Sequence, residues 1–215
     1  MIFGDRVIAF KKLGKLFLDF NNNNLFIDAT ERAELNNTWF TKRSIEYAFS
    51  SLGEMLKSDF LKKWVQSYEI KNECKRIGVI VPSNIPLVGF YDFLCVLLSG
   101  NIFVGKLSSS NDVMLPFLSD ILCKINPKFK SFIFFEKEMK NIDLLIATGN
   151  DNTADIFNFS YINYNKIIRR NRTSVAILDG LETNHEYKKL AYDIHMYFGL
   201  GCRSVSKLFI PRSFD

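Results

Sequence analysis

Arg76-Ile-Gly-Val-Ile-Val-Pro-Ser-Asn-Ile-Pro-Leu-Val-Gly-Phe-Tyr-Asp-Phe-Leu-Cys-Val-Leu-Leu-Ser-Gly-Asn-Ile-Phe-Val-Gly-Lys-Leu107 is the stretch that decides the fold. Its residues 77–81 form an apolar run rich in β-branched side chains, which predicts a buried strand. Two prolines break the run, and residues 87–98 then predict an apolar helix closed by Gly100. Pro86 fits the first helical turn, where a missing N–H costs little. Residues 102–107 predict a second strand, so the stretch is a strand–helix–strand unit.

The same alternation continues toward the C-terminus. Ser108 to Asn111 predict a turn, and Asp112 is the expected cap of a helix that reaches about Ile125. A helix is expected after Thr153, another from about Thr183 to Tyr197, and short strands at 131–135, 143–147, 167–168, 175–178 and 207–210. Alternating strands and helices predict a parallel sheet with helices on both faces.

Helical patterns come before the sheet. Apolar residues recur at helical spacing over residues 4–20 and 41–56, with Thr41 as a plausible N-cap, and a short helix is expected after Ser58. The asparagine run 21–24 predicts a polar loop. These helices show no chemistry of their own, and we expect them to pack against the sheet.

Composition narrows the class of protein. The 215 residues are 47% hydrophobic and 24% charged, which is typical of a soluble globular chain. No apolar run approaches the roughly 20 residues of a membrane-spanning helix. Four cysteines without a CxxC pair, and no signal peptide pattern, predict a reducing cytoplasm. The two histidines have no ligand partners at metal spacing, so no metal site is predicted.

The positive charge is modest and spread along the chain. The net charge is +5, and the densest basic group is Lys166-Ile-Ile-Arg-Arg-Asn-Arg172. That group fits a solvated surface, and an anionic ligand such as a phosphorylated cofactor explains it at least as well. Nucleic-acid binding needs a clustered stripe and a recognisable module, neither of which is present, so no nucleic-acid partner is expected.

One cysteine has a setting that suits a nucleophile. Cys202 lies in Tyr197-Phe-Gly-Leu-Gly-Cys-Arg-Ser-Val-Ser-Lys-Leu-Phe209, between a predicted helix and a predicted strand. A thiolate attacks carbonyl carbon, and a backbone N–H beside the sulfur can stabilise the oxyanion. Gly199 and Gly201 allow close approach to the backbone. The alternative is a loop cysteine that only fills space. Cys95 and Cys123 lie in apolar runs and are expected to be buried.

Polar residues follow several of the predicted strands. They are Ser83, Asn84, Lys106, Ser108 and residues 148–152, at the carboxyl ends where parallel sheets bind ligands. The chain has no G-x-G-x-x-G motif, but the Thr148-Gly149-Asn150 turn could leave a helix N-terminus free for phosphate. Taken singly, each of these residues is explained equally well as a capping residue.

Together the segments resemble one family. The motifs that carry the likeness are Asn84-Ile-Pro-Leu-Val-Gly-Phe90, Leu97-Leu-Ser-Gly100, Lys106-Leu-Ser-Ser109, Ala147-Thr-Gly149, Ile168-Arg-Arg-Asn-Arg-Thr-Ser-Val-Ala176 and the Cys202 segment. They resemble the long-chain acyl-CoA reductases, the LuxC-type fatty-acid reductases best known from luminous bacteria. That resemblance implies an α/β, aldehyde dehydrogenase-like fold with a Rossmann-like parallel sheet preceded by N-terminal helices. It also implies a division into a helical segment (1–75), a dinucleotide-binding domain (76–200) and a nucleophile loop with the first strand of a catalytic domain (201–215).

The resemblance assigns roles to two catalytic residues and marks one departure. Cys202 falls on the family's catalytic cysteine, and Asn84 falls on the asparagine whose amide helps to hold the oxyanion. Hydrolytic aldehyde dehydrogenases carry a water-activating glutamate where this chain has Ile177. Its absence fits an acylating reductase, in which hydride rather than water empties the thioester. Asp179 or Glu182 is the alternative, as a displaced base.

The resemblance also assigns the cofactor site. Lys106 and Ser108 fall where the family grips the adenosine ribose or its 2′-phosphate, so NADPH is expected, with NADH as the alternative. Thr148, Gly149 and Asn150 fall on the turn that meets the pyrophosphate.

The implied activity is reduction of fatty acyl-CoA to fatty aldehyde through a Cys202 thioester. Implied partners are the acyl-CoA substrate, fatty-acid-activating or acyl-transferring proteins, and further copies in a homo-oligomer; bioluminescence is one setting for the aldehyde. Because family chains continue well beyond their cysteine, a truncated product is expected here. A non-catalytic nucleotide-binding fragment and a hydrolytic NAD(P)-dependent aldehyde dehydrogenase remain the alternatives.

Overall fold

The computed structural model describes residues 1–69, 73–108 and 113–212. They form two compact units, Met1–Arg169 and Arg170–Asp215, and each unit is described by itself. The sequence suggested boundaries near 75/76 and 200/201 instead. The family's domain plan therefore stays a prediction, while the compact units divide at residue 169.

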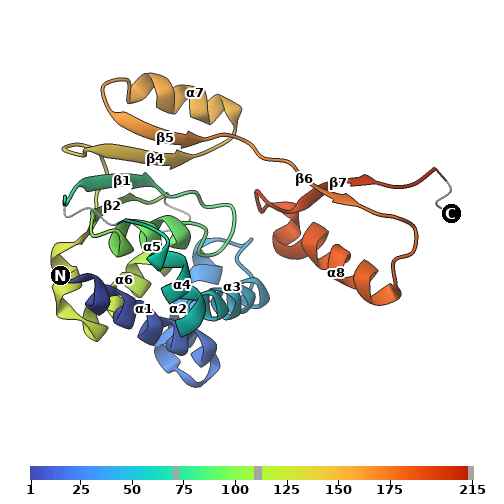
Figure 1. The fold of residues 1–215 in the computed structure, drawn as a ribbon, viewed down its shortest axis with the longest axis horizontal. Helices are drawn as coiled ribbons and strands as arrows, with labels where there is room; N and C mark the ends of the chain where they lie inside the picture. Colours follow the sequence, from blue (N-terminus) through green and yellow to red (C-terminus); the bar gives the residue numbers. More distant parts are fainter. Residues whose placement is uncertain (70–72, 109–112, 213–215) are drawn as a thin grey trace. The chain divides into compact units, whose positions relative to one another are not determined.

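A five-stranded parallel sheet organises the first unit (Figure 1). Its strands are β1 (Arg76–Ile80), β2 (Ile102–Lys106), β3 (Ile133–Phe135), β4 (Leu144–Thr148) and β5 (Asn165–Arg169). The spatial order is β3-β2-β1-β4-β5, so the chain moves outward on one side of β1 and then returns to its other side. Such a reversal between neighbouring strands is the topological switch point at which open α/β sheets bind ligands.

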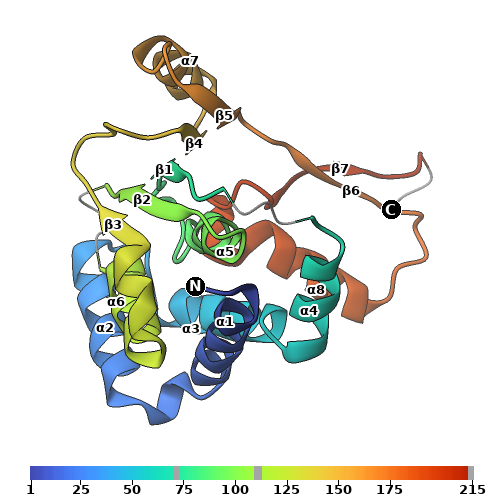
Figure 2. The same ribbon diagram turned by 60° about the vertical axis from the view of Figure 1, so that its left-hand side comes forward.

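Helices cover both faces of this sheet, as predicted (Figures 1 and 2). One face packs with α5 (Phe90–Leu98) and α6 (Met114–Ile125) in the larger core cluster, to which Val79, Phe103 and Ile146 belong. The other face gives Val104 and Leu145 to a smaller cluster under α7 (Asp151–Ser160). Alternate residues of a strand point to opposite faces, so strands buried on both sides are apolar throughout.

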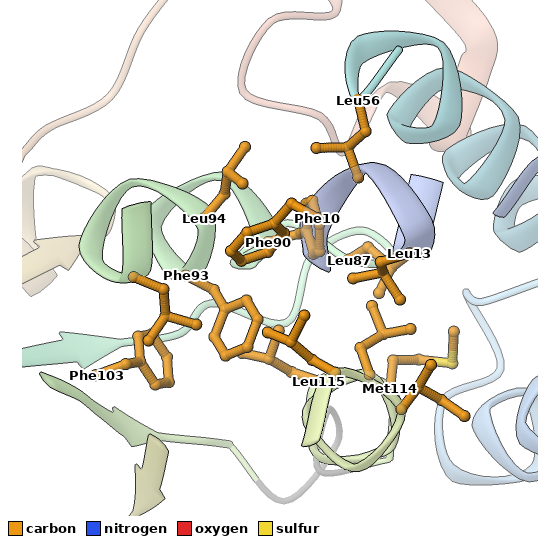
Figure 3. Close-up of a cluster of buried hydrophobic side chains, with 14 of the residues drawn as sticks. Phe10, Leu13, Leu56, Leu87, Phe90, Phe93, Leu94, Phe103, Met114 and Leu115 are labelled. Atoms are coloured by element: carbon orange, nitrogen blue, oxygen red, sulfur yellow. The ribbon is translucent and has the colours of Figure 1, made fainter. Parts of the chain in front are cut away.

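The N-terminal helices share the larger core with the sheet. They are α1 (Phe3–Leu18), α2 (Asn24–Asn36), α3 (Lys42–Met55) and α4 (Ser58–Gln66). Phe10 of α1 meets Phe90 and Phe93 of α5 with ring centroids 6.4 and 6.3 Å apart, in edge-on geometry. Figure 3 shows these rings together with Leu13 of α1 and Leu115 of α6. The helices are thus one layer of the first unit.

The structure corrects the predicted helices at three places. The asparagine run does not form a mere loop, because Asn23 caps α2 by accepting a hydrogen bond from the N–H of Leu25 at 3.1 Å. Helix α2 itself was missed, since it buries only four residues and shows a weak pattern. Pro86 does not begin a helix either: α5 starts at Phe90, after Leu87 adopts a left-handed φ of 57°. The predicted cap Asp112 lies outside the described residues.

The second unit is a small strand–helix–strand element. Strands β6 (Ser174–Ile177) and β7 (Val205–Phe209) pair in parallel, joined through α8 (Asn184–His195) and the 3₁₀ helix η3 (Met196–Gly199). Thr183 and Glu186 form a reciprocal capping box at the start of α8, which fixes where that helix begins. None of the described residues after Arg169 is fully buried.

Candidate functional site

Three of the predicted site segments share one edge of the sheet. Lys106 ends β2 and Thr148 ends β4, while Asn84 follows β1, which lies between them. The register pairs Ile80 with Lys106 on one side and with Ala147 on the other. Asn84, Lys106 and the Thr148 turn therefore all leave the sheet at the carboxyl edge beside the switch point.

The turn that carries Asn84 is held at its base. The N–H of Val81 donates to the carbonyl of Lys106 at 3.0 Å, and the Asn37 amide donates to the carbonyl of Ser83 at 3.3 Å. A Cβ on Gly89 would lie 2.5 Å from Cγ1 of Val81, so only glycine permits this approach. Asn84 itself is half-buried. These contacts fix both ends of the turn relative to β1.

The Thr148–Asn150 turn opens α7. The Asn150 side chain accepts a hydrogen bond from the N–H of Thr153 at 2.8 Å, so the capping role considered for it is present in the structure. The N–H of Gly149 donates to the carbonyl of Arg169 at 3.1 Å. A Cβ on Gly149 would lie 2.8 Å from both Cβ and Cγ2 of Thr153. The turn therefore brings backbone close to the helix N-terminus without an intervening side chain.

Lys106, the last residue of β2, and Ser108, two residues beyond it, are both half-buried. Ser109 and Ser110, which belong to the same predicted turn, lie outside the described residues. A cation at the carboxyl edge of the sheet is suited to a phosphate or ribose ligand.

An ion pair at this edge escaped sequence reasoning. Nη1 of Arg169, at the end of β5, donates to both carboxylate oxygens of Asp92 at 2.8 Å. Asp92 is 8% exposed, in the first turn of α5. Lys166 donates to the carbonyls of Asn158 and Tyr161 at 3.0 and 3.1 Å. Lys166 and Arg169 of the basic group 166–172 thus form hydrogen bonds within the protein. The density of positive charge was the only feature of the sequence that pointed to this segment.

The cysteines differ in exposure. Cys74 and Cys202 are exposed, whereas Cys95 and Cys123 are half-buried rather than buried as predicted. Burial, followed by the Asp92 carboxylate, raises the pKa of Cys95 to about 11. Cys95 borders a hollow of about 560 Å³ between α4 and α5, which keeps it from full burial. None of the predicted site residues lines that hollow, so it is not part of the candidate site.

Cys202 lies in a tight turn of the second unit. Tyr197, Phe198 and Gly199 adopt φ values of 57°, 56° and 74°, so three successive residues are left-handed. Two of them carry side chains, which makes this conformation costly and is typical of functional turns. Beyond it, the N–H of Ser204 donates to the carbonyl of Gly201 at 2.9 Å, which folds the backbone around Cys202. The sequence prediction of a cysteine between helix and strand is confirmed.

Ile177, which stands where hydrolytic aldehyde dehydrogenases carry their water-activating glutamate, has an apolar and exposed side chain. Ile177 ends β6 and is 79% exposed. The displaced-base alternative is weak for Glu182, because its carboxylate accepts hydrogen bonds from the N–H groups of Asp179 and Gly180 at 2.7 and 3.0 Å. Desolvation by itself raises the pKa of the Glu182 carboxyl, but these hydrogen bonds outweigh it and lower that pKa. A carboxylate with a lowered pKa is a poorer base.

The described ranges contain neither a metal-binding cluster nor a membrane-spanning helix. No group of three or more His, Cys, Asp or Glu side chains there could hold a metal ion. Among the same residues, no helix has the length and apolarity needed to cross a membrane.

The fold is that of the aldehyde dehydrogenases. The chain is similar to a putative aldehyde dehydrogenase from Burkholderia cenocepacia, with a TM-score of 0.73 and 13% identity, over 99% of this chain and 50% of that one. It is also similar to a Mycobacterium tuberculosis aldehyde dehydrogenase complexed with NAD+, with a TM-score of 0.71 and 15% identity, over 99% of this chain and 48% of that one. A third similar structure is succinic semialdehyde dehydrogenase from Streptococcus pyogenes in complex with NADP+, with a TM-score of 0.66 and 11% identity, over 97% of this chain and 50% of that one. The chain thus spans about half the length of these structures.

A match to a family model identifies the family to which the chain belongs. Residues 22–213 match the family model of acyl-CoA reductase (LuxC), and the chain belongs to that family. The resemblance inferred from the motifs is thereby confirmed. A comparison with curated protein sequences finds no match.

Proposed function

We propose that the full-length protein reduces fatty acyl-CoA to fatty aldehyde through a thioester on Cys202. The carrying observation is an exposed cysteine in a glycine-rich turn that directly follows a left-handed segment at residues 197–199, in a chain of the LuxC family. An ordinary loop cysteine needs no strained backbone before it. A nucleophile needs an open approach and nearby backbone N–H groups, which such a turn offers.

The proposed chemistry uses residues of both units. The Cys202 thiolate attacks the thioester carbonyl, the C–S bond to CoA breaks, and CoA leaves as a thiolate that takes a proton. The Asn84 amide and the Cys202 backbone N–H stabilise the oxyanion. A reduced nicotinamide, when bound, supplies the hydride that converts the acyl group to aldehyde and returns the thiol.

The carboxyl edge fits a dinucleotide. The missing Cβ at Gly149 lets the turn pack closely against Thr153, which brings its backbone to the N-terminus of α7 where a pyrophosphate would be held, and Lys106 offers a cation two strands away. Thr148 and Asn150 complete the turn. NADPH is proposed over NADH because Lys106 and Ser108 suit a 2′-phosphate. Lys106→Ala and Ser108→Ala should then raise KM for NADPH while leaving KM for NADH nearly constant; equal changes for both would remove the NADPH assignment.

Radiolabelled acyl-CoA tests the covalent step. The wild-type protein should retain label after denaturation, and Cys202→Ala should retain none. Cys74→Ala is the matched control, because Cys74 is also exposed. Dinucleotide binding without label would favour the nucleotide-binding fragment instead. Release of free acid from aldehyde and NAD would favour the hydrolytic enzyme, against which Ile177 argues.

A homo-oligomer is proposed through α7. Ile156 and Phe159 on this helix, and Ile162 just beyond it, are 62%, 82% and 70% exposed. Residues three apart on a helix share a face, and an apolar face of this kind is typical of a protein interface. The four free cysteines fit the proposed reducing cytoplasm. Fatty-acid-activating proteins that supply the acyl group, and a bioluminescent use of the aldehyde, are proposed on the family alone.

A further inference from the structure

We infer that Asp92 and Arg169 are positioning residues, which together hold the Thr148–Asn150 turn in the geometry that receives the dinucleotide phosphates. The inference rests on the proposed function for the role of that turn. It assigns a task to the basic group 166–172, whose density in the sequence had no explanation beyond a solvated surface or an anionic ligand.

The main chain of Arg169 holds the turn directly. Its carbonyl accepts a hydrogen bond from the N–H of Gly149 at 3.1 Å, and its Cα pairs in register with Thr148. The carbonyl can fix Gly149 only if Arg169 is itself fixed. Strand β5 lies at the edge of the sheet, with β4 as its one neighbour, and Arg169 is its last residue. Strand ends of this kind fray unless something else restrains them.

The side chain of Arg169 supplies that restraint. Its Nη1 donates to Oδ1 and Oδ2 of Asp92, each at 2.8 Å, and the Asp92 side chain is only 11% exposed. Asp92 belongs to the first turn of α5, which is packed into the core through Phe90 and Phe93. The edge strand is therefore tied to a rigid helix on one face of the sheet. A charge-assisted bond to a buried carboxylate is a strong tie, because breaking it leaves that charge without its partner.

A purely structural ion pair on the same sheet provides a control. Nη2 of Arg76 contacts Oε1 of Glu136 at 3.0 Å, with side chains 33% and 35% exposed. Arg76 begins β1, at the opposite end of that strand from the Thr148 turn, and Glu136 directly follows β3, three strands away from β4. Loss of this pair should affect stability without affecting the turn.

The experiment compares Arg169→Gln, Asp92→Asn, their combination and Glu136→Gln in the full-length protein. Hydrogen exchange of residues 148–153 reports the turn, and NADPH fluorescence reports the dissociation constant. We expect Arg169→Gln to raise exchange and the dissociation constant by about tenfold each, which corresponds to about 1.4 kcal/mol. At saturating NADPH, kcat should stay within about twofold. Glu136→Gln should leave the exchange and NADPH binding as in the wild type.

The double variant separates positioning from stability. Asp92→Asn with Arg169→Gln removes the uncompensated charge, so its stability should exceed that of Asp92→Asn or Arg169→Gln alone, while the turn should remain loose and NADPH binding weak. Unchanged exchange in Arg169→Gln, an equal rise in Glu136→Gln, or wild-type NADPH binding by the double variant would overturn the inference. If the wild type binds no NADPH but exchange responds as expected, the positioning role stands and the proposed function fails.

Discussion

Gly149→Ala is the substitution whose effect follows most directly from the geometry. The new Cβ would lie 2.8 Å from Cβ and Cγ2 of Thr153, whereas its 3.6 Å approach to Phe157 is an ordinary contact. The clash is with a β-branched residue in the first turn of α7, and a helical backbone cannot yield easily. The Thr148–Asn150 turn must therefore move away from the helix.

Two costs add when the turn moves. Overpacking of this kind costs about 1–3 kcal/mol, and the Asn150 cap, worth about 1 kcal/mol, weakens as its 2.8 Å bond to the N–H of Thr153 lengthens. We expect the free energy of unfolding to fall by about 2–4 kcal/mol in urea titrations. We also expect at least tenfold weaker NADPH binding, because the backbone proposed to bind the phosphates is displaced.

Two comparisons check the cause of this effect. Gly4→Ala adds the same methyl group within helix α1 where no atom lies within 4 Å, so it should leave NADPH binding unchanged and should not lower stability. Thr153→Gly removes the atoms that clash, so its combination with Gly149→Ala should be less harmful than the sum of the two substitutions. If Gly149→Ala has wild-type stability and NADPH affinity, the close approach of the turn to α7 does not constrain the site and the reasoning is refuted.

Three further predictions concern packing, thiol chemistry and assembly. Gly14→Ala should destabilise the first unit by about 1–3 kcal/mol in urea unfolding, because its Cβ would lie 2.6 Å from Cβ of Leu56 where α1 crosses the end of α3. Iodoacetamide at pH 8 should label Cys202 well before Cys95, as judged by peptide mass spectrometry. Burial also makes the folded state hold the Cys95 proton more tightly, so stability should fall between about pH 9 and 11. Phe159→Asp should lower the sedimentation coefficient by dissociating the oligomer; an unchanged value would exclude the α7 face.

The centre of the sheet was predictable because β1, β2 and β4 are buried on both faces. A central strand of this kind appears in the sequence as a short apolar run, which can be recognised without knowing the neighbouring strands. The sequences of β1, β2 and β4 each contain such a run. The polar residues after those runs were then expected at one edge, since parallel strands end together. The structure gives Asn84, Lys106 and Thr148 that placement.

The features that were missed depend on partners far away in the sequence. Asp92 and Arg169 are separated by 77 residues, and neither local pattern shows that one charge is buried against the other. In the sequence, Asp92 stands as a lone acid in an apolar helix and Arg169 as one cation among several. Helix α2 escaped for a related reason: its buried side is defined by what packs on it, such as Phe49 of α3 against Phe26. The ion pair and helix α2 both depend on which residues meet in the folded protein, and residue type alone does not show this.

Helix α5 couples the helical layer to the candidate site. Its Phe90 and Phe93 pack on α1, and Phe93 also packs on Phe103 of β2 with ring centroids 5.0 Å apart. The turn that carries Asn84 leads directly into this helix, and its Asp92 holds Arg169. A shift of α5 would therefore move Asn84, the proposed oxyanion ligand, and loosen the proposed phosphate-binding turn together. For this reason the N-terminal helices, which carry no chemistry themselves, set the geometry on which the proposed chemistry depends.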